Sequence, residues 1–191
     1  MKYEDKWQLN DGSTVIPDDA DKLEKDGSVV AYRLPLKVFD FGSGPVAAHK
    51  HPKGGGWVAD TATVSESAYV GPDALVYGNA KVWGKTHIFG KAQVFGKAQV
   101  FGEAQVYDEA RVFDEARVSD KAWVYGDALI SGKAQVYGEA QVFGEAQVYG
   151  EARVFGEAWV FGEAWVYGEA EVFGKAQVSG TSIIGNTSQV N

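Results

Sequence analysis

Three histidines are the residues of this chain best suited to metal chemistry, because imidazole is the commonest metal ligand in proteins. His49 and His51 lie together in the segment HKHPKGGG, and His87 lies well downstream. No cysteine and no carboxylate motif accompanies them at a spacing typical of a metal site. We therefore interpret all three as surface histidines, and we expect no metal and no cofactor.

Other kinds of catalytic group are also missing from the sequence. No serine, histidine and aspartate occur in a pattern typical of a catalytic triad. The glycines recur every six residues, which is the spacing of chain corners and not of a phosphate-binding loop. We expect no catalytic residue and predict that the protein is not an enzyme.

The side chains best suited to recognising a partner are tryptophan, glutamine and glutamate in the second half of the chain. Exposed aromatic side chains dominate the energy of binding interfaces, and neighbouring amides supply adaptable hydrogen bonds. Glutamate recurs every six residues in the later repeats, where earlier repeats have lysine, and predicts acidic columns that attract cations or a basic partner. The candidate binding residues are Trp123, Gln141, Trp159, Trp165, Glu157 and Glu163.

A six-residue repeat must position these side chains. An aliphatic residue recurs at every sixth position from Val58 to Val190, and a small residue, usually alanine, lies two positions before it. This alternation predicts a short strand whose alanine and valine point inward and whose middle residue points outward. Glycine usually follows two positions after the valine, where a sharp corner needs it. Each repeat therefore predicts one strand and one corner.

Three repeats would close a triangular coil of about 18 residues, and stacking would pair each strand with its counterparts at about 4.8 Å. The sequence thus predicts an all-β fold, a parallel β-solenoid of about seven coils over residues 57–191. A helix is excluded because a period of six cannot keep an apolar stripe on one helix face. Trp123, Gln141 and Trp159 then share one face, and Trp165 lies on another.

The repeat resembles that of the hexapeptide-repeat superfamily, in which an aliphatic residue, three variable residues and a small residue recur. The segment GGGWVADTATVSESAYV is similar to the start of the repeats in bacterial and phage proteins of the YdcK-like group. The resemblance implies a left-handed parallel β-helix. It also implies two enzyme classes as alternatives, namely hexapeptide acyltransferases and carbonic-anhydrase-like enzymes.

Both enzyme classes are disfavoured by what the sequence lacks. Acyltransferases of the superfamily use a histidine near a subunit interface and loops that leave the coils, but here the repeat keeps its phase from Val58 to Val190. Loops on a rigid scaffold are the usual site of catalysis. The carbonic-anhydrase-like branch binds zinc through three histidines, but His49 and His51 precede the first full coil and His87 lies two coils later.

The repeat divides the chain into two parts. Residues 1–56 lack it, hold most of the prolines, and are expected to cap the open strand edges of the first coil. Within them, SVVAYRLPLKVFDFGSG predicts two short strands, and PDDADKLEKDG predicts a helical turn or a loop. At the other end the repeat continues to Val190 without a lid, so we expect a homo-oligomer in which two copies pair tail to tail.

Composition limits the partners and the compartment. The chain has a formal net charge of −8 at pH 7 and a pI near 4.9, so we expect it to bind neither nucleic acid directly nor an anionic membrane. It has no cysteine, which fits a cytosolic protein. Neither a signal peptide nor a membrane span is expected. The expected location is the cytoplasm, or the virion if a phage encodes the protein.

These features favour a non-enzymatic β-helical scaffold that uses aromatic and acidic outer faces to bind a protein partner or copies of itself. The two enzyme classes stay open as one alternative. Another alternative is an acidic mimic of nucleic acid that occupies a DNA-binding host protein, as the glutamate columns suggest.

Overall fold

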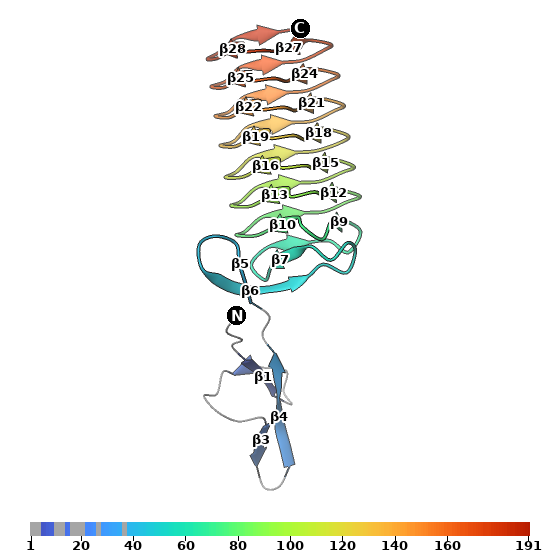
Figure 1. The fold of residues 1–191 in the computed structure, drawn as a ribbon, viewed down its shortest axis with the longest axis vertical. Coiled ribbons are helices and arrows are strands. Elements are labelled where there is room, and N and C mark those ends of the chain that lie inside the picture. Colours follow the sequence, from blue (N-terminus) through green and yellow to red (C-terminus); the bar gives the residue numbers. More distant parts are fainter. Residues whose placement is uncertain (1–4, 10–13, 16–21, 26–27, 36–37) are drawn as a thin grey trace. The chain divides into compact units, whose positions relative to one another are not determined.

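The computed structural model describes residues 5–9, 14–15, 22–25, 28–35 and 38–191. The chain forms two compact units, residues 1–49 and residues 50–191. The second unit contains the six-residue repeats, which form a stack of coils (Figure 1).

The first unit is antiparallel. Its sheet has the strand order β2-β1-β4-β3, formed by β1 (Asp5–Leu9), β2 (Thr14–Val15), β3 (Lys22–Lys25) and β4 (Ser28–Pro35). A hairpin follows, formed by β5 (Val38–Asp40) and β6 (Pro45–Lys50). The two strands expected between residues 28 and 44 are confirmed as β4 and β5. The helical turn or loop expected around residues 17–27 is wrong for residues 22–25, which pair with β4, and the rest of that segment lies outside the described residues. The capping role of residues 1–56 stays a prediction.

The second unit has three faces, and each face is a parallel sheet. Face 1 consists of β7 (Trp57–Ala59), β10 (Leu75–Val76), β13 (Gln93–Val94), β16 (Arg111–Val112), β19 (Leu129–Ile130), β22 (Gln147–Val148), β25 (Trp165–Val166) and β28 (Ile183–Ile184). Face 2 consists of β8 (Thr63–Val64), β11 (Lys81–Val82), β14 (Gln99–Val100), β17 (Arg117–Val118), β20 (Gln135–Val136), β23 (Arg153–Val154), β26 (Glu171–Val172) and β29 (Gln189–Val190). Face 3 consists of β9 (Tyr69–Val70), β12 (His87–Ile88), β15 (Gln105–Val106), β18 (Trp123–Val124), β21 (Gln141–Val142), β24 (Trp159–Val160) and β27 (Gln177–Val178).

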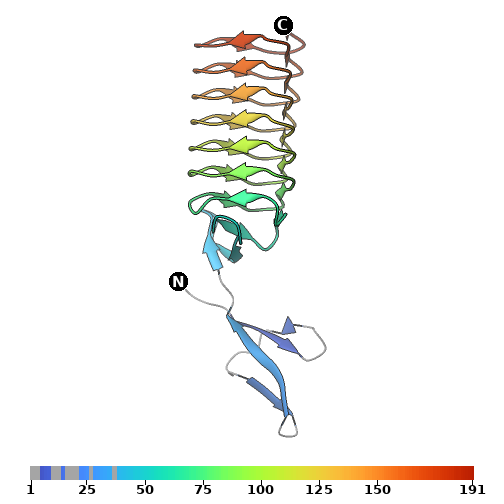
Figure 2. The same ribbon diagram turned by 90° about the vertical axis from the view of Figure 1, so that its right-hand side faces the viewer.

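Strands of successive coils pair in a constant register. On face 3, Gln141 pairs with Trp159 and Val142 with Val160, and the same offset recurs on the other two faces. The coils therefore lie level above one another in both side views (Figures 1 and 2). This arrangement confirms the predicted all-β fold and the parallel β-solenoid of about seven coils.

The core is a narrow column of alanine and valine. Ala158 and Val160, on either side of the outward residue of β24, are both fully buried, and the same holds for most repeats. Thr86 is the polar exception in this column: it is fully buried, and its hydroxyl has no hydrogen-bond partner. Because this interior is narrow and packed almost entirely with alanine, valine and isoleucine, the charged and aromatic side chains of the repeat lie outside it.

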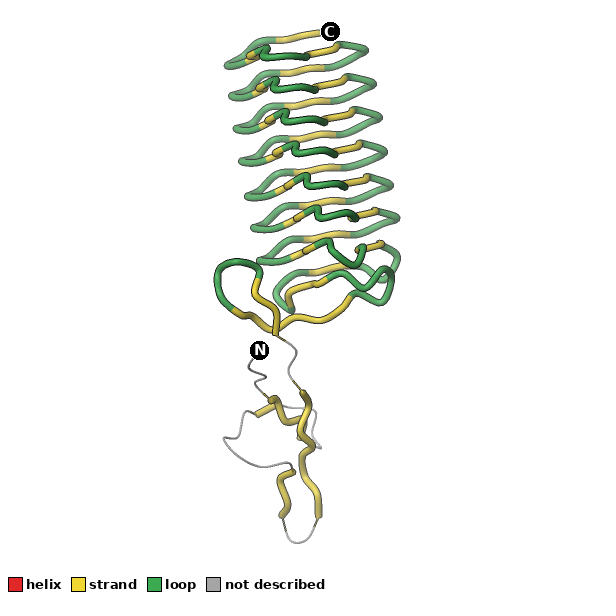
Figure 3. The backbone as a smooth tube through the Cα atoms, in the orientation of Figure 1, coloured by secondary structure: helices red, strands yellow, loops and turns green. Residues whose placement is uncertain are grey.

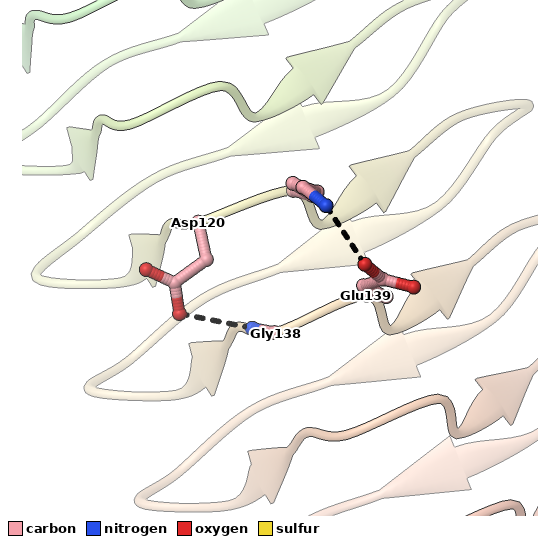
Figure 4. Close-up of polar contacts among 4 residues, drawn as sticks. Asp120, Gly138 and Glu139 are labelled. Carbon is pink, nitrogen blue, oxygen red and sulfur yellow. Dashed lines mark hydrogen bonds and ion pairs between the residues drawn. The ribbon is translucent and has the colours of Figure 1, made fainter.

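The corners depend on residues that accept a positive φ. Gly144 has a φ of 70°, and a Cβ placed on it would lie 3.0 Å from the backbone nitrogen of Gly162 in the next coil. One coil instead has aspartate at its corners, and there the carboxylate of Asp120 accepts a hydrogen bond from the Gly138 amide at 3.1 Å (Figure 4). These corners are the loop segments between the strands in Figure 3. Among the described residues no helix is long and apolar enough to cross a membrane.

Aromatic side chains stack along the corners. The longest stack follows face 3 and comprises Phe89, Tyr107, Tyr125, Phe143 and Phe161. Its ring centroids are 4.7 to 5.0 Å apart and its rings are parallel to within 4°. The other two corners also carry columns of stacked aromatic residues, but a serine interrupts each of these columns, one at Ser119 and the other at Ser131. Only the corner beside face 3 therefore has a continuous stack through the middle of the solenoid, and such ring pairs contribute about 0.5–1.5 kcal/mol each.

Candidate functional site

On four successive strands of face 3, the outward side chains alternate between tryptophan and glutamine. Trp123 and Trp159 are each 40% exposed, although the core residues beside them in sequence, Val124 and Val160, are fully buried. Gln141 lies between the two tryptophans because it pairs with both in the sheet. The sequence assignment of these three residues to one outward face is confirmed.

The structure divides the six predicted binding residues between two faces. Trp123, Gln141, Glu157 and Trp159 line one groove on face 3. Trp165 is outward and 43% exposed, but it belongs to β25 of face 1, and Glu163 precedes it in the same coil. Glu163 and Trp165 are therefore not part of the groove.

The groove has a volume of about 450 Å³ and runs over four neighbouring strands of face 3. Its lining residues are Lys121, Trp123, Glu139, Gln141, Glu157, Trp159, Lys175 and Gln177. Sequence reasoning missed the two lysines, Glu139 and Gln177 as members of this site. The spacing of the repeat could have indicated these four residues, because residues 18 positions apart in the sequence lie side by side on neighbouring strands.

Two residues of the groove are held by the aromatic stack beside it. The Tyr125 hydroxyl donates a hydrogen bond to Oε1 of Gln141 at 3.3 Å. The Trp159 ring meets the Phe143 ring edge to face, with centroids 6.4 Å apart and an angle of 73° between the rings. The stack thus restrains both side chains at the surface, which lowers the entropy that they would lose on binding a ligand.

Two ion pairs form the border of the groove. Lys121 Nζ lies 3.0 Å from Glu139 Oε1 (Figure 4), and Lys175 Nζ lies 3.7 Å from Glu157 Oε2. The hydrogen bond from Lys121 to Glu139, and next the charge of Glu139, raise the pKa of Lys121. Both pairs are exposed, so they add little to stability, but their opposite charges cancel within the groove.

The acidic columns predicted from the sequence are only partly present. Lysine and glutamate alternate between coils and pair, as in Lys91 with Glu109 at 2.8 Å and Lys133 with Glu151 at 2.9 Å. One column of carboxylates, which we call the acidic strip, has no ion pair among the described residues. It consists of Asp127, Glu145 and Glu163.

The three histidines do not converge. His51 is only 3% exposed, and its Nε2 lies 3.2 Å from the backbone carbonyl oxygen of Ser65. The interpretation of His51 as a surface histidine is therefore wrong, because its ring fills the start of the solenoid and bonds to the backbone there. His49 and His87 are exposed. Within the described part of the chain, no group of three histidine, aspartate or glutamate residues could hold a metal ion.

Comparison with protein families adds one finding to this geometry. Residues 146–162 match the family model described as the YdcK Beta solenoid repeat. The chain is a repeat β-solenoid. The matched segment is shorter than one coil and includes β22, β23 and β24, and hence Trp159 of the groove. No curated protein and no solved structure matches the chain.

Proposed function

We propose that the chain is a hexapeptide-repeat β-solenoid that acts as a non-enzymatic scaffold and binds its partner through face 3. The six-residue period and the constant register support the hexapeptide assignment. The strands of neighbouring coils are tied by regular backbone hydrogen bonds of mostly 2.7 to 3.0 Å. Such a solenoid provides a rigid, extended surface on which a partner finds side chains at regular intervals.

The groove on face 3 is the observation that carries this proposal. Single exposed aromatic side chains are ordinary, but exposed apolar side chains grouped in one place mark interaction sites, and tryptophan is enriched among the residues that dominate binding energy. Here two exposed tryptophans lie in one groove with Gln141 between them, and the aromatic stack restrains Gln141 and Trp159. The site is therefore organised for binding before a partner arrives.

The test compares two tryptophan variants of the full chain. The double variant Trp123→Ala/Trp159→Ala removes both indoles of the groove, and Trp165→Ala removes an equally exposed indole from face 1. Immobilised wild type and Trp165→Ala should retain the same partner from an extract of the encoding organism, and the double variant should lose it. Equal retention by all three proteins would contradict a binding role for face 3.

The acidic strip supports a second candidate function, in which the chain mimics nucleic acid and a basic DNA-binding protein binds to the strip. Asp127, Glu145 and Glu163 lie one coil apart, so their charges are closely spaced and repel one another modestly in water. A basic protein would relieve that repulsion. Its binding should weaken steeply between low and physiological salt and be lost in Glu145→Gln/Glu163→Gln. Salt-independent binding would exclude this candidate.

Self-assembly through the last coil is a third candidate. Each of the three sheets ends in one strand of the last coil, namely β27, β28 or β29, and this strand pairs with a neighbour on one side only. Ile183 of β28 is 64% exposed. Two copies could continue each other's sheets in antiparallel pairing about a two-fold axis. Light scattering coupled to size exclusion should then give a dimer at two salt concentrations, whereas a monomer at high concentration would contradict this candidate.

A further inference from the structure

The outward side chains of face 3 form a ladder with a repeat of two strands. We call Trp123, Gln141, Trp159 and Gln177 the Trp/Gln ladder. Neighbouring parallel strands lie about 4.8 Å apart, so the two indoles are repeated at about 9.6 Å along the axis of the stack. Two hexose units of an extended β-linked chain cover nearly this length.

We propose that the Trp/Gln ladder binds a linear, uncharged polysaccharide of β-linked hexoses lying along the axis of the stack. The proposal rests on the proposed function and names the chemical class of the partner. Hexopyranose rings have an apolar C–H face that stacks on indole, and aromatic side chains supply large apolar contact areas with a defined geometry. Every second sugar ring would stack on Trp123 or Trp159.

The amides of the ladder lie where the intervening sugar must form hydrogen bonds. Gln141 is between the two indoles, and its Oε1 already accepts a hydrogen bond from Tyr125. This bond orients the amide and leaves its nitrogen to donate to a sugar hydroxyl. Gln177 follows Trp159 on the next strand, although the stack residue beside it is Phe161, which has no hydroxyl to orient the amide. Alternating aromatic and amide groups thus correspond to alternating stacked and hydrogen-bonded sugar units.

The charge balance of the groove favours a neutral polymer. Two lysines and two glutamates line it, and they are paired as Lys121 with Glu139 and Lys175 with Glu157. The groove therefore has no net charge, although the whole chain has a formal charge of −8. A polyanion or a polycation would have to break these pairs without a compensating field, whereas sugar hydroxyls can bond to them as they are.

The groove also continues along the stack, as a polymer site requires. A second groove of about 400 Å³ adjoins the first and shares Lys121 and Trp123 with it. It extends the surface to Gln105 and His87. A site of this form accommodates the interior of a chain and not only its end.

The other faces lack the same arrangement among the described residues. Face 1 has Trp57 and Trp165, but they lie near opposite ends of its strand order. Face 2 has no outward tryptophan. Trp165→Ala is therefore a matched control that removes an exposed indole without changing the ladder.

Native gel electrophoresis in the presence of soluble polysaccharide tests the proposal on the full chain. The probes are hydroxyethyl cellulose as a neutral β-1,4-linked glucan, dextran as a neutral α-linked glucan, and alginate as a charged polymer. Wild type and Trp165→Ala should be retarded by the β-linked glucan only. Trp123→Ala/Trp159→Ala should lose at least about tenfold in affinity, as expected when the dominant aromatic contacts of a site are removed.

A length series sharpens the test. In calorimetry, a β-1,4-linked oligosaccharide long enough to reach both indoles should bind more tightly to wild type than one that covers a single indole, and Trp159→Ala should abolish the difference. Circular dichroism and thermal unfolding of each variant establish that it is folded.

Three results would overturn the proposal: no retardation of wild type by the β-linked glucan, equal retardation by dextran or alginate, or unchanged retardation of the double variant. A protein partner that binds wild type but not the double variant, without any retardation by glucan, would overturn the polysaccharide and leave the proposed function standing. If wild type showed no interaction that depends on Trp123 and Trp159, with either glucan or protein, both proposals would be contradicted.

Discussion

At the scale of the residue, side-chain direction decides what each position does. The neighbouring residues Gln147 and Val148 differ completely in environment, because Val148 is fully buried and Gln147 belongs to the outward series of face 1. The alternation of a strand accounts for this difference. It could be predicted from the sequence because the repeat never shifts its phase.

Substitution of these two neighbours should therefore have very different effects. Val148→Asp places a charge in the alanine and valine core without a partner and should destabilise the protein by about 4 kcal/mol or more. Gln147→Ala should change the free energy of unfolding by less than about 0.5 kcal/mol. Thermal unfolding of both variants measures this difference, and equal shifts would contradict the assignment of inward and outward positions.

Thr86 offers a substitution that should stabilise the protein. Its buried hydroxyl has no hydrogen-bond partner, and a buried polar group in that state costs free energy. Thr86→Val keeps the shape, removes the hydroxyl, and should raise the free energy of unfolding by about 1 kcal/mol. The control Thr86→Ser keeps the hydroxyl, loses a methyl group and should destabilise. A lower melting temperature for Thr86→Val would refute this reading of the core.

At the scale of the element, each strand is short and gains its order from the strands above and below it. Register explains the ion pairs between coils and the aromatic stack, since both join residues of neighbouring coils. The sequence predicted which residues share a face, because the spacing alone determines that. It did not predict the bond from Tyr125 to Gln141, the contact of Trp159 with Phe143, or the burial of His51, since these depend on side-chain conformation and on the turn before the first coil.

The stacked tyrosines predict how stability depends on pH. Partial burial raises the pKa of Tyr107 and Tyr125, and the charge of Tyr125 raises that of Tyr107 further. The folded protein thus keeps these protons at a pH where the unfolded chain, with a tyrosine pKa near 10, loses them. Their contribution is fully present below about pH 10 and is lost as the pH rises through the raised folded pKa.

Urea unfolding at several pH values between about 8 and 11 measures this effect. Wild type should lose stability steadily at the alkaline end, and the double variant Tyr107→Phe/Tyr125→Phe should lose less. The exposed lysines, such as Lys121, change stability in the same direction, so some dependence should remain in the variant. A double variant as sensitive to pH as wild type would show that the tyrosines do not contribute.

At the scale of the whole solenoid, the repeat separates stability from recognition. Alanine, valine and glycine form the coils, and the outward position of each strand is left to vary without cost to the core. The groove on face 3 arises where two such positions, Trp123 and Trp159, have tryptophan two coils apart. The sequence could therefore predict which residues share the face of the candidate site, whereas the ion pairs at the border of the groove and its continuation along the stack became visible only in the structure.

The central claim is that the indoles of face 3 recognise the partner, and a titration followed by nuclear magnetic resonance tests it most directly. The chain has six tryptophans, so a nitrogen-15-labelled protein gives six indole N–H signals. On addition of a β-1,4-linked glucan oligosaccharide, the signals of Trp123 and Trp159 should shift together while that of Trp165 stays in place. Shifts confined to Trp165 or Trp83, or no shift in any indole signal, would contradict recognition of this ligand by face 3.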